Sequence, residues 1–237
     1  MTILLHLDAS ARIAGSQTRR LGRLFVERWR ALRPDDTVVH RDVGREPPRP
    51  VTDSWIAAAF TRPERRPPDM IAALAESDRL VDELERADII VAGVPMYNFG
   101  LPAQMKAYID NIVRVGRTFG LDRTRAGDPD WPMLRGKRLV ILSSRGDRGY
   151  DPGGWIAHKN HVEPHLRAAF GYIGITDVVS IAVEADAFAD QHLAQSLAAA
   201  EAAVERLVQR MGGARRLNPR LRGASLPRRL AVPGAGR

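Results

Sequence analysis

The sequence predicts a single α/β domain with a doubly wound, five-stranded parallel sheet and helices on both faces. The chain has 237 residues, enough for one domain with a substantial core and some appendages. Short apolar segments alternate with helical patterns, which is typical of parallel strands joined by right-handed crossovers. Loops that carry polar side chains follow three of these segments and converge on one crevice if the strand order is 2-1-3-4-5. The five expected strands are residues 3–7, 37–42, 87–94, 138–143 and 177–183.

Helical spacing of apolar residues predicts a helix after each strand. The first carries a stripe of apolar side chains (Leu21, Leu24, Phe25 and Leu32), and the third carries a similar one (Met105, Ile109, Ile112 and Val113). The other expected helices are residues 71–85, 158–172 and 191–211. In the fourth helix, three histidines (His158, His161 and His165) would share a face that resembles a metal site. No carboxylate stands at suitable spacing, so a cap or core role is favoured and no metal is expected.

Two segments interrupt the alternation of strands and helices. Residues 46–70 contain six prolines, and residues 120–136 contain a run of Asp, Pro and Trp. Both are long for strand-to-helix connections. We expect each to form a lid, a subunit contact or a substrate wall.

Composition excludes several functions. The chain has no cysteine, which excludes disulfides, thiolate metal sites and cysteine nucleophiles. No run of eighteen apolar residues is present, and the chain enters the first expected strand without a basic leader. We therefore expect a soluble, cytoplasmic protein that does not bind a membrane.

The formal charge of +8 is concentrated at the C-terminus. Residues 212–237 hold seven arginines and no acid, so removing them leaves a formal charge of +1. This tail is rich in Gly and Pro and lacks apolar periodicity, which is typical of a disordered, solvated extension. Contact with nucleic acid, an anionic surface or a partner subunit is the alternative. We expect residues 1–211 to form the folded domain.

The loop after the first strand has the composition of an anion cradle. Ser10, Ser16, Gln17 and Thr18 bring polar side chains to the start of a helix, where unpaired N–H groups and the helix dipole favour a phosphate. Helix capping alone would also explain Ser16. Neither GxGxxG nor GxxxxGK[ST] is present, so the pattern favours a mononucleotide over a dinucleotide or a P-loop ligand.

The loop after the third strand is constrained and carries aromatic rings. It contains Pro95, Met96, Tyr97, Asn98 and Phe99, followed by a glycine and a second proline. Prolines fix φ on both sides, and the intervening amides have no strand partner. Such a loop can present backbone donors to a flat polar ligand. An ordinary connection with a packed Tyr and Phe is the alternative.

The loop after the fourth strand contains Ser144, Arg145, Gly146 and Asp147. At the same sheet edge it would hold a ring through amides and a guanidinium. A tight turn with a local ion pair is the alternative.

In order and spacing these residues resemble the FMN-dependent NADH azoreductases, also known as FMN-dependent NADH:quinone oxidoreductases, of the flavodoxin-like superfamily. The similarity covers residues 1 to about 211 and includes further motifs (P-x-x-M-K-x-x-I-D at 102–110, G-x-T-F at 116–119 and G-Y-I-G-I-T-D at 171–177). It implies a flavodoxin-like fold and FMN as cofactor. It implies phosphate contacts at Ser10 and residues 16–18, ring contacts at residues 96–99 and 144–146, and a homodimer with sites at the interface.

The resemblance also implies a reaction. We expect a ping-pong cycle in which NADH or NADPH reduces FMN and a quinone or azo compound then takes two electrons, with no catalytic side chain. Phe119, Trp131 and Tyr150 are candidates for stacking with nicotinamide or acceptor. Asp147 stands where the family often has a second glycine, and its carboxylate would either disfavour the anionic reduced ring or pair with Arg145 or Arg148. The alternatives are a flavodoxin-type electron carrier and a nucleic-acid-binding protein that acts through the tail.

Overall fold

The computed structural model describes residues 1–187 and 190–213. Its main sheet has five parallel strands in the order β2-β1-β3-β6-β7, which is the predicted order when only the strands of this sheet are counted. The strands are β1 (Ile3–Asp8), β2 (Thr37–Asp42), β3 (Ile89–Pro95), β6 (Arg138–Ser144) and β7 (Asp177–Val183). Each expected strand is therefore confirmed within two residues at either end.

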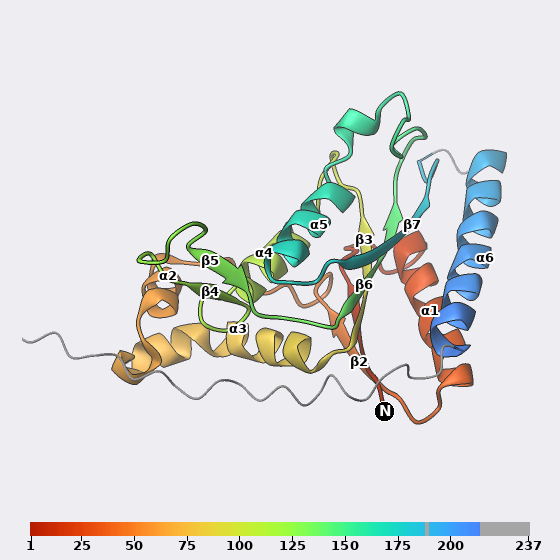
Figure 1. The fold of residues 1–237 in the computed structure, drawn as a ribbon. Coiled ribbons are helices and arrows are strands. Elements are labelled where there is room, and N and C mark those ends of the chain that lie inside the picture. Colours follow the sequence, from red (N-terminus) through yellow and green to blue (C-terminus); the bar gives the residue numbers. More distant parts are fainter. Residues whose placement is uncertain (188–189, 214–237) are drawn as a thin grey trace, which may run out of the picture.

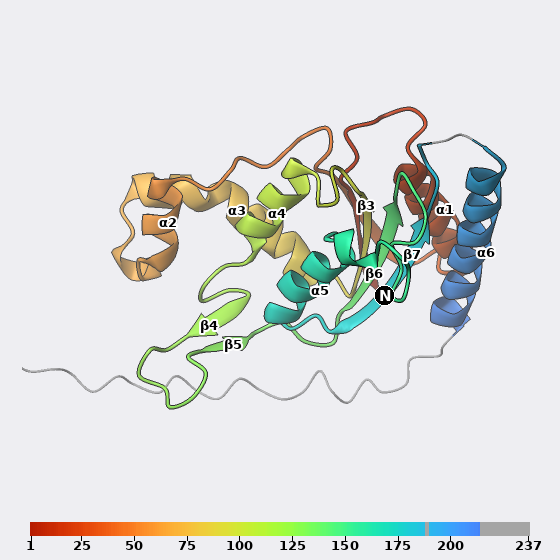
Figure 2. The ribbon, with the colours of Figure 1, turned by 90° about the horizontal axis from the view of Figure 1, so that it is seen from above.

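Helices cover both faces of this sheet (Figures 1 and 2). Helices α1 (Gln17–Leu32) and α6 (Gln191–Gly213) lie side by side on one face. Helices α3 (Pro68–Arg86), α4 (Ala103–Ile112) and α5 (Glu163–Tyr172) cover the other. Alternate residues of each strand feed two separate cores: Leu4 and Val91 pack under α1 and α6, whereas Leu5 and Ile90 pack under the opposite layer.

The expected helix 158–172 is shorter than predicted. A 3-10 turn (Ala157–Lys159) precedes α5, which begins only at Glu163. Pro164 lies in the first turn of α5, where its fixed φ and missing N–H are tolerated, whereas an interior proline would break a helix. His158 and His161 are therefore outside the helix, and the expected helical face of three histidines does not exist.

Both interrupting segments fold into defined elements. Residues 46–70 contain helix α2 (Asp53–Phe60) and a 3-10 turn (Pro63–Arg65). Residues 120–136 contribute to an antiparallel hairpin of β4 (Phe119–Leu121) and β5 (Asp130–Pro132). Figures 1 and 2 show α2 beyond α3, on the side of the molecule remote from α6.

No helix within residues 1–187 and 190–213 is long and apolar enough to cross a membrane. The tail expected at residues 212–237 lies outside the described residues except for the last two glycines of α6.

Candidate functional site

The loop after β3 is held in a strained turn. Tyr97 and Gly100 exchange backbone hydrogen bonds at 3.0 and 3.1 Å, and between them Asn98 and Phe99 have φ values of +48° and +71°. Non-glycine residues adopt positive φ infrequently, and such strain concentrates at ligand-binding sites. The amides of Asn98 and Phe99 donate to no acceptor in the described chain. The Tyr97 amide, by contrast, is already bonded to the Gly100 carbonyl.

The loop after β1 ends in a capped helix. Ser16 is the N-cap of α1, and its Oγ accepts a hydrogen bond from the Arg19 amide at 3.4 Å. The Ser16 and Thr18 hydroxyls lie 3.2 Å apart and are buried. The amides of Gln17 and Thr18 have no acceptor among the described residues. Two free amides and two hydroxyls at a helix N-terminus are the kind of donors that favour an anion.

Hydrogen bonds from the Arg19 side chain hold the loop after β1 in its conformation. Its guanidinium donates to the carbonyls of Ser10 at 2.7 Å and Arg12 at 3.1 Å, and it forms two 2.7 Å bonds to Asp42. Partial burial acts to raise the pKa of Asp42, but the Arg19 hydrogen bonds outweigh it and lower that pKa. A Cβ on Gly44 would lie 2.2 Å from the Ser10 carbonyl oxygen, so only glycine fits beside the loop. Neither Arg19 nor Gly44 was predicted from the sequence.

The loop after β6 contributes backbone rather than a guanidinium. The Arg145 side chain is 3 % exposed and binds Asp151 and Glu163, each at 2.6 Å, and Glu184 at 3.3 Å. The prediction that the Arg145 guanidinium contacts a ring is therefore wrong. The guanidinium is instead bound within a cluster of three carboxylates. The neighbouring Ser144 and Gly146 remain on the crevice wall.

Asp147 does not pair with either arginine that the sequence suggested. Its Oδ1 accepts a 2.8 Å hydrogen bond from the amide of Arg148, and the structure gives it no ion pair among the described residues. Its carbonyl accepts from the Ala185 amide at 3.3 Å, which ties this loop to the end of β7.

The three loops enclose a crevice of about 220 Å³ at the carboxyl edge of the sheet. Tyr97 bridges two of them, because its Oη lies 3.5 Å from the Ser10 Oγ and accepts from the Ala11 amide at 3.2 Å. Predicted residues on its wall are Ser10, Ser16, Pro95, Met96, Tyr97, Ser144 and Gly146. Gln17 reaches its rim, where Nε2 donates to Asp186 at 3.4 Å.

Three crevice residues were not predicted: Arg12, Asp186 and Ala187. Asp186 and Ala187 follow β7, so the carboxyl-edge rule that selected the other loops would have found them. Arg12 stands within the predicted loop and forms no ion pair in the described chain. Arg12 therefore brings to the crevice lining a positive charge that no described carboxylate pairs with.

The three stacking candidates occupy different places. Tyr150 lies at the carboxyl edge but is buried, with its amide near Glu184. Phe119 and Trp131 lie on the β4–β5 hairpin, and the Phe119 ring packs at 5.0 Å from that of Tyr172 at the end of α5. That end of α5 leads into the start of β7, so the hairpin sits at the opposite edge of the sheet from the crevice. The chain does not bring Phe119 and Trp131 to its own crevice.

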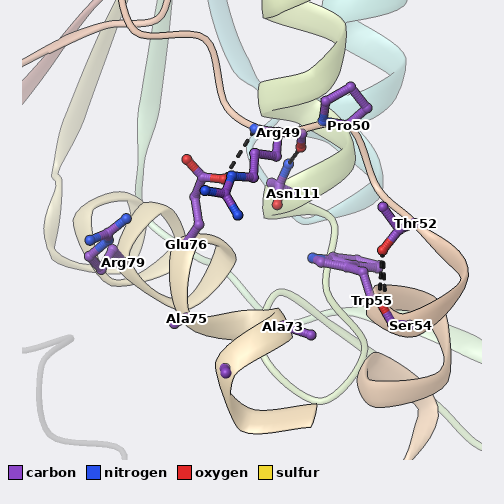
Figure 3. A pocket seen from close by; sticks show the side chains of 11 residues that line it. Arg49, Pro50, Thr52, Ser54, Trp55, Ala73, Ala75, Glu76, Arg79 and Asn111 are labelled. Atoms are coloured by element: carbon purple, nitrogen blue, oxygen red, sulfur yellow. Dashed lines mark hydrogen bonds between the residues drawn. The ribbon is translucent and has the colours of Figure 1, made fainter. Parts of the chain in front are cut away.

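A second cavity, of about 450 Å³, lies between α2, α3 and the end of α4 (Figure 3). Asn111 donates to the Arg49 carbonyl at 2.9 Å, and Glu76 accepts from the Arg49 amide at 3.1 Å. The segment of residues 46–70 is thus anchored to the main domain at this cavity. Its walls come from elements other than the three crevice loops.

The fold and the crevice define a flavodoxin-like protein, and a family model described as a flavodoxin-like fold matches residues 2–207. An FMN-dependent NADH:quinone oxidoreductase from Opitutus terrae is 48% identical over 191 residues, which cover 81% of this chain and 89% of that protein. An FMN-dependent NAD(P)H:quinone oxidoreductase from Pseudomonas aeruginosa is 44% identical over 78% of this chain and 88% of its own length. The chain belongs to the family of FMN-dependent NADH:quinone oxidoreductases.

Solved structures agree on the fold. An azoreductase from Bacillus anthracis is 22% identical and superimposes with a TM-score of 0.79 over 89% of this chain and all of its own. An FMN-dependent NADH-azoreductase from the same species, solved in complex with FMN, has a TM-score of 0.74 at 19% identity, over 88% of this chain and all of its own.

Proposed function

We propose that this protein binds FMN in the crevice and transfers two electrons from NADH or NADPH to a quinone, or to an azo compound, by a ping-pong mechanism. The observation that carries the proposal is a set of amides without acceptors among the described residues, on two loops that line the crevice: Gln17 and Thr18 follow Ser16, and Asn98 and Phe99 follow Tyr97. Bound FMN supplies hydride acceptance from nicotinamide and two-electron donation to the acceptor. The chain supplies orientation, electrostatics and access.

The phosphate of FMN belongs at the start of α1. The free amides of Gln17 and Thr18, the Ser10 and Ser16 hydroxyls and the positive end of the helix dipole all favour a dianion there. Arg12 adds a cation to the same wall. We therefore expect the crevice to bind FMN more tightly than riboflavin, which has no phosphate to accept these hydrogen bonds.

The flavin ring belongs against the loops after β3 and β6. Met96 and Tyr97 line the crevice, and the amides of Asn98 and Phe99 in the strained turn have no acceptor among the described residues. Ring heteroatoms are acceptors of the kind that such amides need, since an unmade buried hydrogen bond costs about 1–3 kcal/mol. Ser144, the Arg145 backbone, Gly146 and Asp147 border the other side of the ring.

The crevice is incomplete within one chain, which favours a homodimer with active sites at the interface. Exposed apolar side chains lie on the loops that follow β3 and β6: Phe99 is 46 % exposed and Trp155 is 72 % exposed. The β4–β5 hairpin carries the half-exposed Trp131 away from its own crevice, where it is free to approach a partner's. In this arrangement a second copy supplies Phe119 or Trp131 for stacking with nicotinamide or acceptor.

The test is an anaerobic absorbance titration of the FMN-loaded protein. NADH is expected to bleach the bound-flavin spectrum, and benzoquinone is expected to restore it after the oxidised nicotinamide has been removed, as a ping-pong order requires. A flavin that neither NADH nor NADPH bleaches would favour an electron carrier. Absence of any FMN binding would refute the site itself.

A paired variant tests the phosphate end. Ser16→Ala combined with Thr18→Ala is expected to weaken FMN binding more than riboflavin binding, because only FMN carries the phosphate. Equal losses for the two ligands would place the phosphate elsewhere. Light scattering at several protein concentrations tests the dimer.

A further inference from the structure

Two imidazoles and a carboxylate meet on the α1 face of the sheet. His6 and Asp8 belong to β1, and His40 lies directly opposite His6 on the neighbouring β2. The His40 Nε2 is 3.0 Å from Asp8 Oδ2, and the His6 Nε2 is 3.7 Å from Asp8 Oδ1. The three ligand atoms lie within 4.8 Å of one another. The register of two parallel strands therefore assembles a His-Asp-His cluster from residues far apart in sequence.

Two atoms of this cluster are buried without a partner. His6 and Asp8 are only 5 % and 4 % exposed, and neither the His6 Nε2 nor the Asp8 Oδ1 has a hydrogen-bond partner among the described residues. Native proteins rarely leave buried polar atoms unpaired, because each unmade bond costs about 1–3 kcal/mol. The two atoms lie 3.7 Å apart, so a single bound group between them could contact both.

Helix α1 packs closely against the cluster through a glycine. A Cβ on Gly22 would lie 2.3 Å from the His6 Nε2, so a larger residue there would have to displace the imidazole. His40 is on the edge strand, and its side chain is 51% exposed, which provides an entry path from solvent.

The donor set suits a zinc-type cation. An imidazole nitrogen binds a metal through its lone pair, and the His6 Nε2 is buried without a hydrogen-bond partner among the described residues. Tetrahedral Zn²⁺ with nitrogen and oxygen ligands places neighbouring donors roughly 3.3 Å apart. The His40 Nε2 lies 3.0 Å from Asp8 Oδ2 and the His6 Nε2 lies 3.7 Å from Asp8 Oδ1, so each nitrogen is close to this value from a different oxygen of the same carboxylate.

The charges that face the cluster do not oppose a cation. Arg19 lies 3.5 Å from Asp8 Oδ2, but its guanidinium is already bonded twice to Asp42 at 2.7 Å. The carboxylates of Asp8 and Asp42 together outweigh the single positive charge of Arg19. We propose that His6, Asp8 and His40 form a Zn²⁺ site in which water on the exposed side of His40 completes the coordination.

The experiment uses the full, FMN-loaded chain without a polyhistidine tag, dialysed against a chelator. Co²⁺ is titrated as a spectroscopic probe and then displaced with Zn²⁺. The wild type is expected to bind one Co²⁺ per chain, with the visible absorption of a tetrahedral site, and to lose it to Zn²⁺. Since changes beyond the direct ligands already cost about 10- to 100-fold in metal affinity, His40→Ala is expected to cost at least about 100-fold.

The matched control is His192→Ala. His192 forms an equivalent pair with Asp190 at 3.0 Å, but the pair is exposed and has no second histidine. This control should leave Co²⁺ affinity unchanged. Absence of saturable binding in the wild type, equal affinity in His40→Ala, or an equal loss in His192→Ala would each overturn the proposal. Because His40 is half exposed, its variant is expected to fold; Asp8→Asn, tested by the same titration, provides an independent check.

Discussion

Arg145→Met tests whether the internal ion cluster holds the loop after β6 in place. Methionine keeps most of the apolar stem of arginine and removes the guanidinium. The variant leaves Glu163, whose side chain is 8 % exposed, without its cation. Glu163 keeps one donor, the Ser143 hydroxyl at 2.5 Å. We expect this substitution to destabilise the protein more than any loss of a surface ion pair.

The expected loss of unfolding free energy in Arg145→Met follows from the burial of Glu163. Removing one partner of a buried ion pair costs about 3–5 kcal/mol, and the remaining Ser143 donor favours the lower end of that range. Asp151 is 67 % exposed and recovers hydration easily, so it adds little. The matched control is Arg138→Met, which breaks an exposed pair with Asp177 and should cost at most about 1 kcal/mol.

The loss of stability in Arg145→Met should depend on pH. In the wild type, burial acts to raise the pKa of Glu163, but the Ser143 hydroxyl and the Arg145 guanidinium hold it below its ordinary value of 4.5. This contribution is fully present above 4.5 and is lost as pH falls through the lowered pKa. Without the guanidinium the pKa rises, so the variant takes up a proton earlier. The difference in stability should therefore shrink as pH falls towards the ordinary value.

Urea unfolding of the flavin-free proteins at neutral and mildly acidic pH measures both effects. The double variant with Glu163→Gln should be more stable at neutral pH than Arg145→Met alone, because it removes the unpaired charge. A cost below about 1 kcal/mol, or one that grows on acidification, would refute the assignment of a buried, ionised Glu163.

Three further substitutions test the crevice and the helices around it. Asn98→Val is expected to lose FMN on gel filtration and about 1–2 kcal/mol of stability, since a β-branched residue resists φ of +48°, whereas Asn98→Gly should retain both. Gly44→Ala should lower FMN affinity in fluorescence titrations, because its Cβ would lie 2.2 Å from the Ser10 carbonyl oxygen; unchanged affinity would contradict the placement of that loop. Gly171→Ala in α5, where a Cβ would meet nothing within 4 Å, should raise stability by roughly 1 kcal/mol in urea unfolding and leave FMN content unchanged.

Local patterns predicted the elements that depend on short-range physics. The sequence alone predicts the buried strand β3 and the helix cap at Ser16, because the apolar run and the capping residue are both local features. The start of α5 was missed because helical periodicity continues upstream of Pro164 even though the backbone does not. The hairpin was missed because its strands have only three residues each and pack against the distant α5, whereas α2 is a short helix whose apolar residues pack against α3, the next helix along the chain.

The sequence by itself determined the parallel sheet, its order and the three loops at its carboxyl edge, since hydrophobic periodicity and the handedness of crossovers leave few topologies. Only the tertiary structure decided where individual side chains go. It turned Arg145 inward to three carboxylates, carried Trp131 away from the crevice and brought His6 beside His40. The physical reason is that charge pairing and strand register join residues distant along the chain, and local sequence does not encode these distances.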